Sequence, residues 1–201
     1  MSVSTSPMAP ESAISAMDAI YRRRAVRDYT HEKVDKAAIH ALLDAAVHAP
    51  TAMHEEPCAF AIVQDKVLLN RLSNCVKDLL ARGIDPIHPR GGKLTHDQFT
   101  ARDFNVFYNA STLIVIYGKS MGPFVAADCW LAAENLLLAC VAHGLGACVI
   151  GLAVTALNTQ EWKKELGVDA GMTAYAPIIL GMPAAPTPQV PRKPPEIFTW
   201  K

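Results

Sequence analysis

Four arginines lie close together in the stretch YRRRAVRDYT, which covers residues 21–30. An arginine suits an anion because its planar guanidinium offers two parallel charge-assisted hydrogen bonds to a phosphate or a carboxylate. Arg23 and Arg27 are four residues apart near the predicted end of a helix, so they could converge on one anion while Arg22 and Arg24 point elsewhere. Charge clusters are more often solvated surface, and by itself this one leaves both interpretations open.

The rest of the chain has no charge excess. Its 201 residues hold 19 Lys and Arg against 19 Asp and Glu, which gives a formal net charge of zero at pH 7. This balance argues against nucleic acid and acidic membranes as partners. The five cysteines are an odd number without paired spacings, which predicts reduced thiols and a cytoplasmic location.

The sequence predicts one domain with an arm and a tail. Residues 1–14 lack the pattern of a signal peptide and are predicted to be a disordered arm. Residues 15–181 form the predicted domain, in which residues 84–108 are a long aromatic connection expected to act as a lid or binding loop. Residues 182–201 hold six prolines between positions 183 and 195 and are predicted to be an extended tail that packs on a partner subunit.

Apolar periodicity predicts short strands separated by helices. No glycine-rich dinucleotide fingerprint follows a predicted strand, so the pattern indicates an α+β fold rather than a Rossmann domain. Strands are predicted at residues 58–64, 112–117, 147–154 and 174–180. Helices are predicted from Ser15 to Arg22, from Asp35 as N-cap to just before Pro50, through Leu68 and Leu79 to Gly83, over 123–143 with Gly144 beyond, and from Asn158 to Gly167.

The most apolar segment is FVAADCWLAAENLLLACVAHG, at residues 124–144. It carries Asp128, Glu134 and Asn135, which a bilayer would penalise heavily, so it is predicted to be a buried helix and not a membrane span. The helix has more apolar surface than one thin sheet can cover. This surplus is typical of a helix at the core of a dimer.

Four segments, in the same order, resemble the nitroreductase family. RRAVRDY is similar to the family's Arg-x-Ser-x-Arg/Lys stretch, and LLDAAVHAPTAMHEEPCAFAIV to its LL-x-AA-x-x-APS-x-x-N-x-QPW-x-F-x-x-V stretch. AAENLLLACVAHGLGACVIG is similar to its central helix and glycine-rich turn, and GMPAAPTPQVPRKPPEIFTW to its tail. The resemblance begins at about Ala16 and implies a nitroreductase-like fold, in which helices surround a central mixed or antiparallel sheet of four to five strands.

The resemblance also implies which residues bind flavin mononucleotide (FMN). Basic side chains at the start and in the tail would hold its phosphate, a turn after the second helix would meet the ring, and a backbone N–H would approach the flavin N5. The phosphate residues are Arg23, Arg24 and Arg27 with Arg192 or Lys193; the ring residues are Pro50, Thr51, Ala52 and His54; the N5 position falls at Ile150 and Gly151.

Four positions depart from the family pattern: Ala25 replaces serine, His54 asparagine, Glu56 glutamine and Cys58 tryptophan. A neutral histidine still supplies one donor and one acceptor. Cys58 lies beside the flavin turn, but the sequence offers it no obvious resolving thiol. Cys140, His143 and Cys148 match no zinc spacing, so core packing and no metal site are expected for them.

The implied function is electron transfer from NADH or NADPH to an electron-poor small molecule, such as a nitroaromatic or a quinone, by a ping-pong mechanism. The flavin carries the chemistry, so no side chain is expected to be catalytic. The resemblance implies a homodimer with flavin at the subunit interface. Two alternatives stay open: a dehalogenating or flavin-fragmenting branch of the same family, and a flavin-binding carrier or sensor without turnover.

Overall fold

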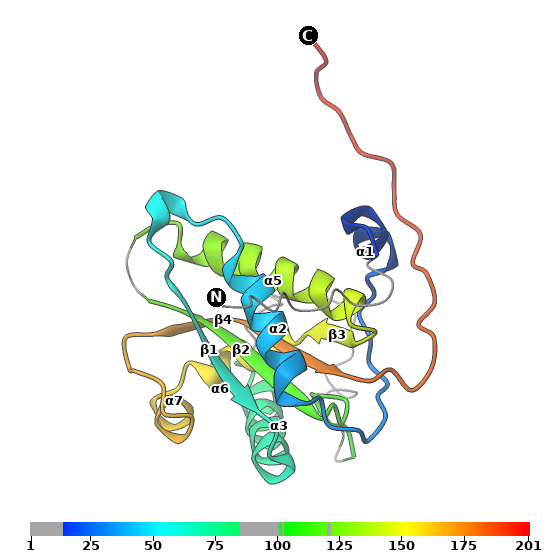
Figure 1. The fold of residues 1–201 in the computed structure, drawn as a ribbon. Helices are drawn as coiled ribbons and strands as arrows, with labels where there is room; N and C mark the ends of the chain where they lie inside the picture. The colour runs from blue at the N-terminus through cyan, green and yellow to red at the C-terminus, as the bar shows by residue number, and fades with distance from the viewer. Residues whose placement is uncertain (1–13, 85–100, 102, 120–121) are drawn as a thin grey trace, which may run out of the picture.

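The computed structural model describes residues 14–84, 101, 103–119 and 122–201 (Figure 1). The predicted N-terminal arm, apart from its last residue, and most of the predicted lid lie outside these residues. At the other end, residues 184–201 are exposed and extended, and Figure 1 shows this tail leaving the body of the protein beside α1 (Ala16–Arg22).

The centre of the fold is a four-stranded sheet in which every neighbouring pair is antiparallel. The middle strands β2 and β4 are buried along nearly their whole length, because helices cover both faces of the sheet. The α+β class and the antiparallel sheet predicted from the sequence are thus confirmed. In the order in which they lie side by side, the strands are β1 (Cys58–Val63), β2 (Thr112–Gly118), β4 (Thr173–Gly181) and β3 (Gly146–Val149).

Side chains of β2 alternate between two hydrophobic cores, as the period of a strand requires. Ile114 and Ile116 lie in the core under α2 (Lys36–Val47) and α5 (Val125–Ala142). Leu113, Val115 and Tyr117 lie in the core on the other face. That second face is covered by α3 (Lys66–Ala81), the short η2 (Gly151–Ala153) and α6 (Val154–Leu157).

The predicted helix ends agree well with the structure. Asp35 caps α2 by accepting a hydrogen bond from the Ala38 N–H at 2.7 Å. Gly83 and Gly144 follow α3 and α5 in the left-handed conformation, at φ values of +75° and +69°. Glycine adopts this conformation without steric cost, which is why it ends helices.

Two predictions around residue 150 are wrong. The predicted strand 147–154 ends at Val149, and the chain then turns into η2 and α6. A short apolar run cannot be assigned to strand or buried helix by periodicity alone. Asn158 does not cap the next helix: Thr159 caps α7 (Gln160–Glu165), while the Asn158 amide donates to the Val154 and Ala174 carbonyls.

Helix α5 is long and apolar enough to cross a bilayer by length and composition alone. In the structure it lies across the sheet, with eight of its residues buried, Asp128 among them. The Asn135 amide donates to the Ala45 carbonyl of α2 at 3.1 Å. The prediction of a buried helix is confirmed for the side of α5 that packs on the sheet and on α2. On the rest of α5, Trp130 and Leu131 remain 46% and 47% exposed.

Candidate functional site

The arginine cluster lies where α1 ends and the chain continues along the outer edge of β3. The Val26 N–H donates to the Ala147 carbonyl at 3.1 Å, and Ala25 bridges Ala147 in a parallel sense. Gly146 makes this approach possible, because a Cβ there would lie 2.7 Å from a methyl group of Val26. The close packing fixes the backbone that carries Arg23 and Arg27.

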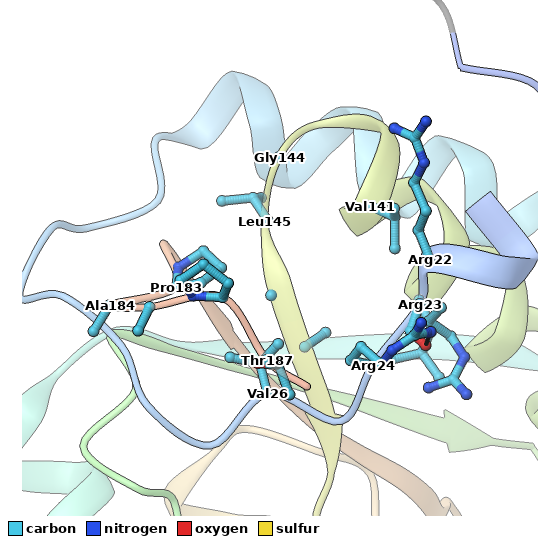
Figure 2. Close-up of a pocket in the computed structure, with 15 residues that line it drawn as sticks. Arg22, Arg23, Arg24, Val26, Val141, Gly144, Leu145, Pro183, Ala184 and Thr187 are labelled. Atoms are coloured by element: carbon cyan, nitrogen blue, oxygen red, sulfur yellow. Dashed lines mark hydrogen bonds between the residues drawn. The ribbon is translucent and has the colours of Figure 1, made fainter. Parts of the chain in front are cut away.

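A cavity of about 490 Å³ opens beside the cluster. Figure 2 shows Arg23 and Arg24 on one wall and Pro183 and Ala184, from the start of the tail, on the opposite wall. Leu137 and Val141, from the C-terminal half of α5, also line it. The cavity is therefore apolar on its helix side and basic at one rim.

Each arginine has a different environment. Arg24 Nη1 donates to the carbonyls of Tyr21 and Arg23, at 2.6 and 2.8 Å, and so satisfies the backbone at the end of α1. Arg23 is three-quarters buried and pairs with Glu134 of α5, its Nε lying 3.7 Å from Oε1. Arg22 is exposed, and Figure 2 shows it pointing away from the other two.

Arg27 does not line the cavity, but its charge and that of Arg23 both act on the Cys148 thiol of β3. Burial raises the pKa of the Cys148 thiol, while the positive charges of Arg27 and Arg23 act in the opposite direction. Arg27 also lies over the Tyr108 ring, 5.8 Å from its centroid. Both arginines are thus within electrostatic reach of one buried thiol at the sheet edge.

The predicted flavin turn lies at the other half of α5. Ala52 begins η1 (Ala52–His54), and its N–H donates to Oδ1 of Asp128 at 3.1 Å. Met53, His54 and Glu56 all have positive φ values, between 46° and 58°, which cost of order 1–3 kcal/mol each for residues with a side chain. Such strain tends to occur at functional sites, where the surrounding structure enforces it.

Asp128 is not among the site residues predicted from the sequence. Its side chain is 3% exposed, and its Oδ2 has no hydrogen-bond partner within the described residues. Buried polar atoms nearly always have a partner, so each exception calls for an explanation. The position directly under the flavin turn suggests that a further group meets this carboxylate.

Ile150 and Gly151, the two predicted N5 contacts, differ in the surroundings of their backbone N–H groups. The Ile150 N–H is already bonded to the Pro177 carbonyl at 2.8 Å, and the side chain is buried. Gly151 is the first residue of η2, and the first N–H groups of a helix have no partner inside it. Of the two predicted N5 contacts, Gly151 is the better donor.

The predicted site residues form three groups within one chain. The arginine cluster runs alongside β3, with Ala25 opposite Ala147, and Gly151 follows the end of that strand. The turn at Pro50–His54 meets the N-terminal half of α5, and Arg192 and Lys193 are on the exposed tail. Figure 1 shows the turn and α1 at opposite ends of α5. A single chain therefore does not bring these groups into one pocket.

The structure distinguishes the cysteines of the hydrophobic cores from Cys58. Cys140 and Cys148 are buried in the cores on opposite faces of the sheet, which agrees with core packing. Cys58, in contrast, has a neighbour that its sequence context did not reveal: its Sγ lies 3.7 Å from the Sγ of Cys129.

Comparison with known proteins identifies the family. Residues 20–182 match the model of the nitroreductase family, so the chain belongs to this family of oxidoreductases. A protein of Methanothermobacter thermautotrophicus, provisionally named an NADH dehydrogenase/NAD(P)H nitroreductase, is 27% identical over 176 residues, which is 86% of this chain and 80% of that protein. The iodotyrosine deiodinase of Thermotoga neapolitana is 25% identical over 87% of this chain and 92% of its own length.

Solved structures agree in fold. The crystal structure of a nitroreductase with bound FMN from Bacteroides fragilis superposes with a TM-score of 0.76, at 24% identity, over 94% of this chain and 98% of that one. This likeness confirms the nitroreductase fold.

Proposed function

We propose that this protein is an FMN-dependent oxidoreductase that transfers electrons from NADH or NADPH to an electron-poor small molecule. The observation that carries the proposal is the position of Arg23 and Arg27, which flank the segment bonded to the edge strand β3 through Val26, in a nitroreductase-family chain. Two guanidinium groups are a suitable donor set for a doubly charged phosphate. Arg192 and Lys193 of the tail would add to it.

The residues present also fit the flavin ring. The Gly151 N–H, at the start of η2, would meet the N5 position, and glycine puts no side chain in the way. The turn at Pro50, Thr51 and Ala52 is held by Asp128, whose second oxygen is free to accept a further hydrogen bond. His54 is exposed and can supply one donor and one acceptor.

When bound, FMN supplies the electron transfer in a ping-pong sequence with a nitroaromatic or a quinone as the default acceptor. The protein's own residues bind and orient it. Arg23 and Arg27 neutralise the phosphate charge, and the strained turn 53–56 presents backbone groups in one fixed conformation. No side chain is assigned a catalytic role in this scheme.

The site is proposed to be completed in a homodimer, with the turn of one subunit meeting the arginines of the other. Two features support this arrangement: the separation of the site residues within one chain, and the exposed apolar side chains Trp130 and Leu131 on α5. Phe198 and Trp200 on the tail are 91% and 89% exposed, which is costly unless a partner covers them. A cytoplasmic location fits the five unpaired cysteines.

A second candidate is reductive dehalogenation of a halogenated aromatic. The similarity to an iodotyrosine deiodinase over 87% of the chain favours it. The two candidates share the cofactor and differ in the acceptor. A flavin carrier or sensor without turnover would share the cofactor too, but would not consume NADH or NADPH.

The deciding experiment is an anaerobic visible spectrum of the purified protein reconstituted with FMN. We expect NADH or NADPH to bleach the flavin absorbance, and a nitroaromatic or a quinone to restore it. Recovery with an iodinated tyrosine and with neither of those acceptors would favour the dehalogenase. Tight FMN binding without bleaching would favour the carrier, and absence of FMN binding would contradict the proposal as a whole.

A further inference from the structure

Two cysteines separated by 71 positions lie with their sulfur atoms in contact. Cys58 is the first residue of β1, and Cys129 is on the second turn of α5. Their Sγ atoms are 3.7 Å apart. All five cysteines of the chain lie among the described residues, and this is the one pair of them joined by a sulfur–sulfur hydrogen bond.

The contact follows from how closely α5 packs on the sheet. Cys58 pairs across the sheet with Gly118, the last residue of β2. A Cβ at Gly118 would collide with Val125 and lie 3.0 Å from the Cys129 sulfur. Because glycine leaves this space empty, the N-terminal half of α5 lies directly against the ends of β1 and β2. The sulfur atoms are therefore held together by the fold and not by a flexible loop.

The two thiols are not equivalent. Cys58 is half-buried and reachable from solvent, whereas Cys129 is fully buried. The hydrogen bond between the two thiols lowers the pKa of Cys58, and the same hydrogen bond together with burial raises the pKa of Cys129. The more accessible and more acidic thiol is the one that an oxidant meets first. Cys129 then occupies the position of a resolving thiol.

We propose that Cys58 and Cys129 form a reversible dithiol–disulfide site that reacts with hydrogen peroxide. The Cys58 thiol gives up its proton, the thiolate attacks one peroxide oxygen and the O–O bond breaks; the hydroxide that leaves takes up that proton, so the products are a sulfenic acid on Cys58 and water. The Cys129 sulfur then displaces the hydroxyl group, which leaves as a second water while the S–S bond forms. Peroxide is the oxidant that accepts the two electrons, and a small dithiol returns the pair to the reduced state by exchange.

The required movement is small. A disulfide has an S–S distance of about 2.05 Å, so the sulfur atoms need to approach by about 1.7 Å. The bond would join the start of β1 to α5 next to Asp128, which holds Ala52. The proposal stands on the sulfur geometry alone and does not depend on flavin binding.

The test is peptide mapping of the full-length protein. The reduced protein is treated with a small excess of hydrogen peroxide, and free thiols are then alkylated. We expect the intact mass to fall by about 2 Da before alkylation, and one cross-linked peptide pair containing Cys58 and Cys129. Dithiothreitol should reverse both changes.

Variants separate the two roles. Cys129→Ser should abolish the cross-link and let a sulfenic acid accumulate on Cys58, where dimedone traps it. Cys58→Ser should abolish both products. Cys75→Ser is the matched control, since Cys75 is also half-buried but lies on α3, and this variant should form the cross-link as the wild type does.

Three results would overturn the proposal. The first is a cross-link that uses other cysteines or joins two chains. The second is oxidation of Cys58 to the sulfinic acid as fast in the wild type as in Cys129→Ser. The third is retention of all thiols after peroxide treatment. Mapping of the wild type decides the first and third, so it remains informative if the buried substitution at Cys129 impairs folding.

Discussion

The backbone N–H of Ala52 donates a hydrogen bond to the Asp128 carboxylate at 3.1 Å, across 76 positions of sequence. Asp128 is buried in the N-terminal half of α5, and Ala52 begins the strained turn that precedes β1. A carboxylate that accepts from a backbone N–H forms a charge-assisted hydrogen bond, which is stronger than a neutral one. The bond therefore holds the proposed flavin turn against the central helix.

Asp128→Ala should loosen this turn. It leaves the Ala52 N–H without its acceptor, which we expect to lower the free energy of unfolding by about 1–3 kcal/mol and to weaken FMN binding. Asp128→Asn keeps an acceptor oxygen and should have a smaller effect on both quantities. Urea unfolding of the apoprotein and a fluorescence titration with FMN measure them. Asp44→Ala, at an exposed position on α2, is the control, and an equal effect of Asp44→Ala would contradict the role of Asp128.

Arg23→Ala and Arg27→Ala should each weaken FMN binding with little change in stability. Loss of one charge-assisted contact to the phosphate costs about 1.5–3 kcal/mol, which corresponds to roughly 10-fold to 100-fold in the dissociation constant. The ion pair of Arg23 with Glu134 is partly exposed and contributes little to folding. Arg22→Ala is the matched control because Arg22, although it lies at the rim of the cavity, is exposed and points away from Arg23. Unchanged affinity in both Arg23→Ala and Arg27→Ala would remove the phosphate assignment.

Trp130→Asp should disrupt the proposed homodimer. The indole is 46% exposed on α5, and a charge placed there would be buried without a partner if two subunits meet on this face. Light scattering coupled to size-exclusion chromatography should give the mass of one chain for this variant and of two chains for the wild type. Val67→Asp, at an exposed position on α3, should leave the mass unchanged. A wild-type protein of single-chain mass would contradict the dimer.

Ionisation of the Tyr117 phenol should lower the free energy of unfolding at alkaline pH. Burial raises the pKa of Tyr117 from 10.0 to about 12, so the unfolded chain releases the phenolic proton at a lower pH than the folded protein does. Between pH 10 and pH 12 deprotonation thus favours the unfolded state, and below pH 10 the contribution is fully retained. Urea unfolding across this range should show a shallower loss of stability for Tyr117→Phe than for the wild type.

The control for this pH dependence is Tyr21→Phe, because Tyr21 is 67% exposed on α1. This variant should keep the alkaline loss of the wild type. Burial raises the pKa of Tyr29 as well, so Tyr117→Phe is expected to remove only part of the loss. Identical pH profiles for Tyr117→Phe and the wild type would contradict the prediction.

The helix ends show where sequence reasoning works best. Asp35, Gly83 and Gly144 act through neighbours within four residues, so their types alone predict the boundaries of α2, α3 and α5. Around residue 150 the same reasoning fails. An apolar run there satisfies a strand and a buried turn equally well, and the packing of η2 and α6 against α3 decides between them.

By itself the sequence determined the α+β class, most element boundaries and the family, because these depend on local periodicity and on ordered motifs. Only the tertiary structure revealed the contact of Ala52 with Asp128 and that of Cys58 with Cys129. Both depend on how closely α5 approaches the sheet over Gly118. Local patterns encode neighbours within a turn of helix or a pair of strand residues, whereas contacts across more than seventy positions arise from packing, which no short segment specifies.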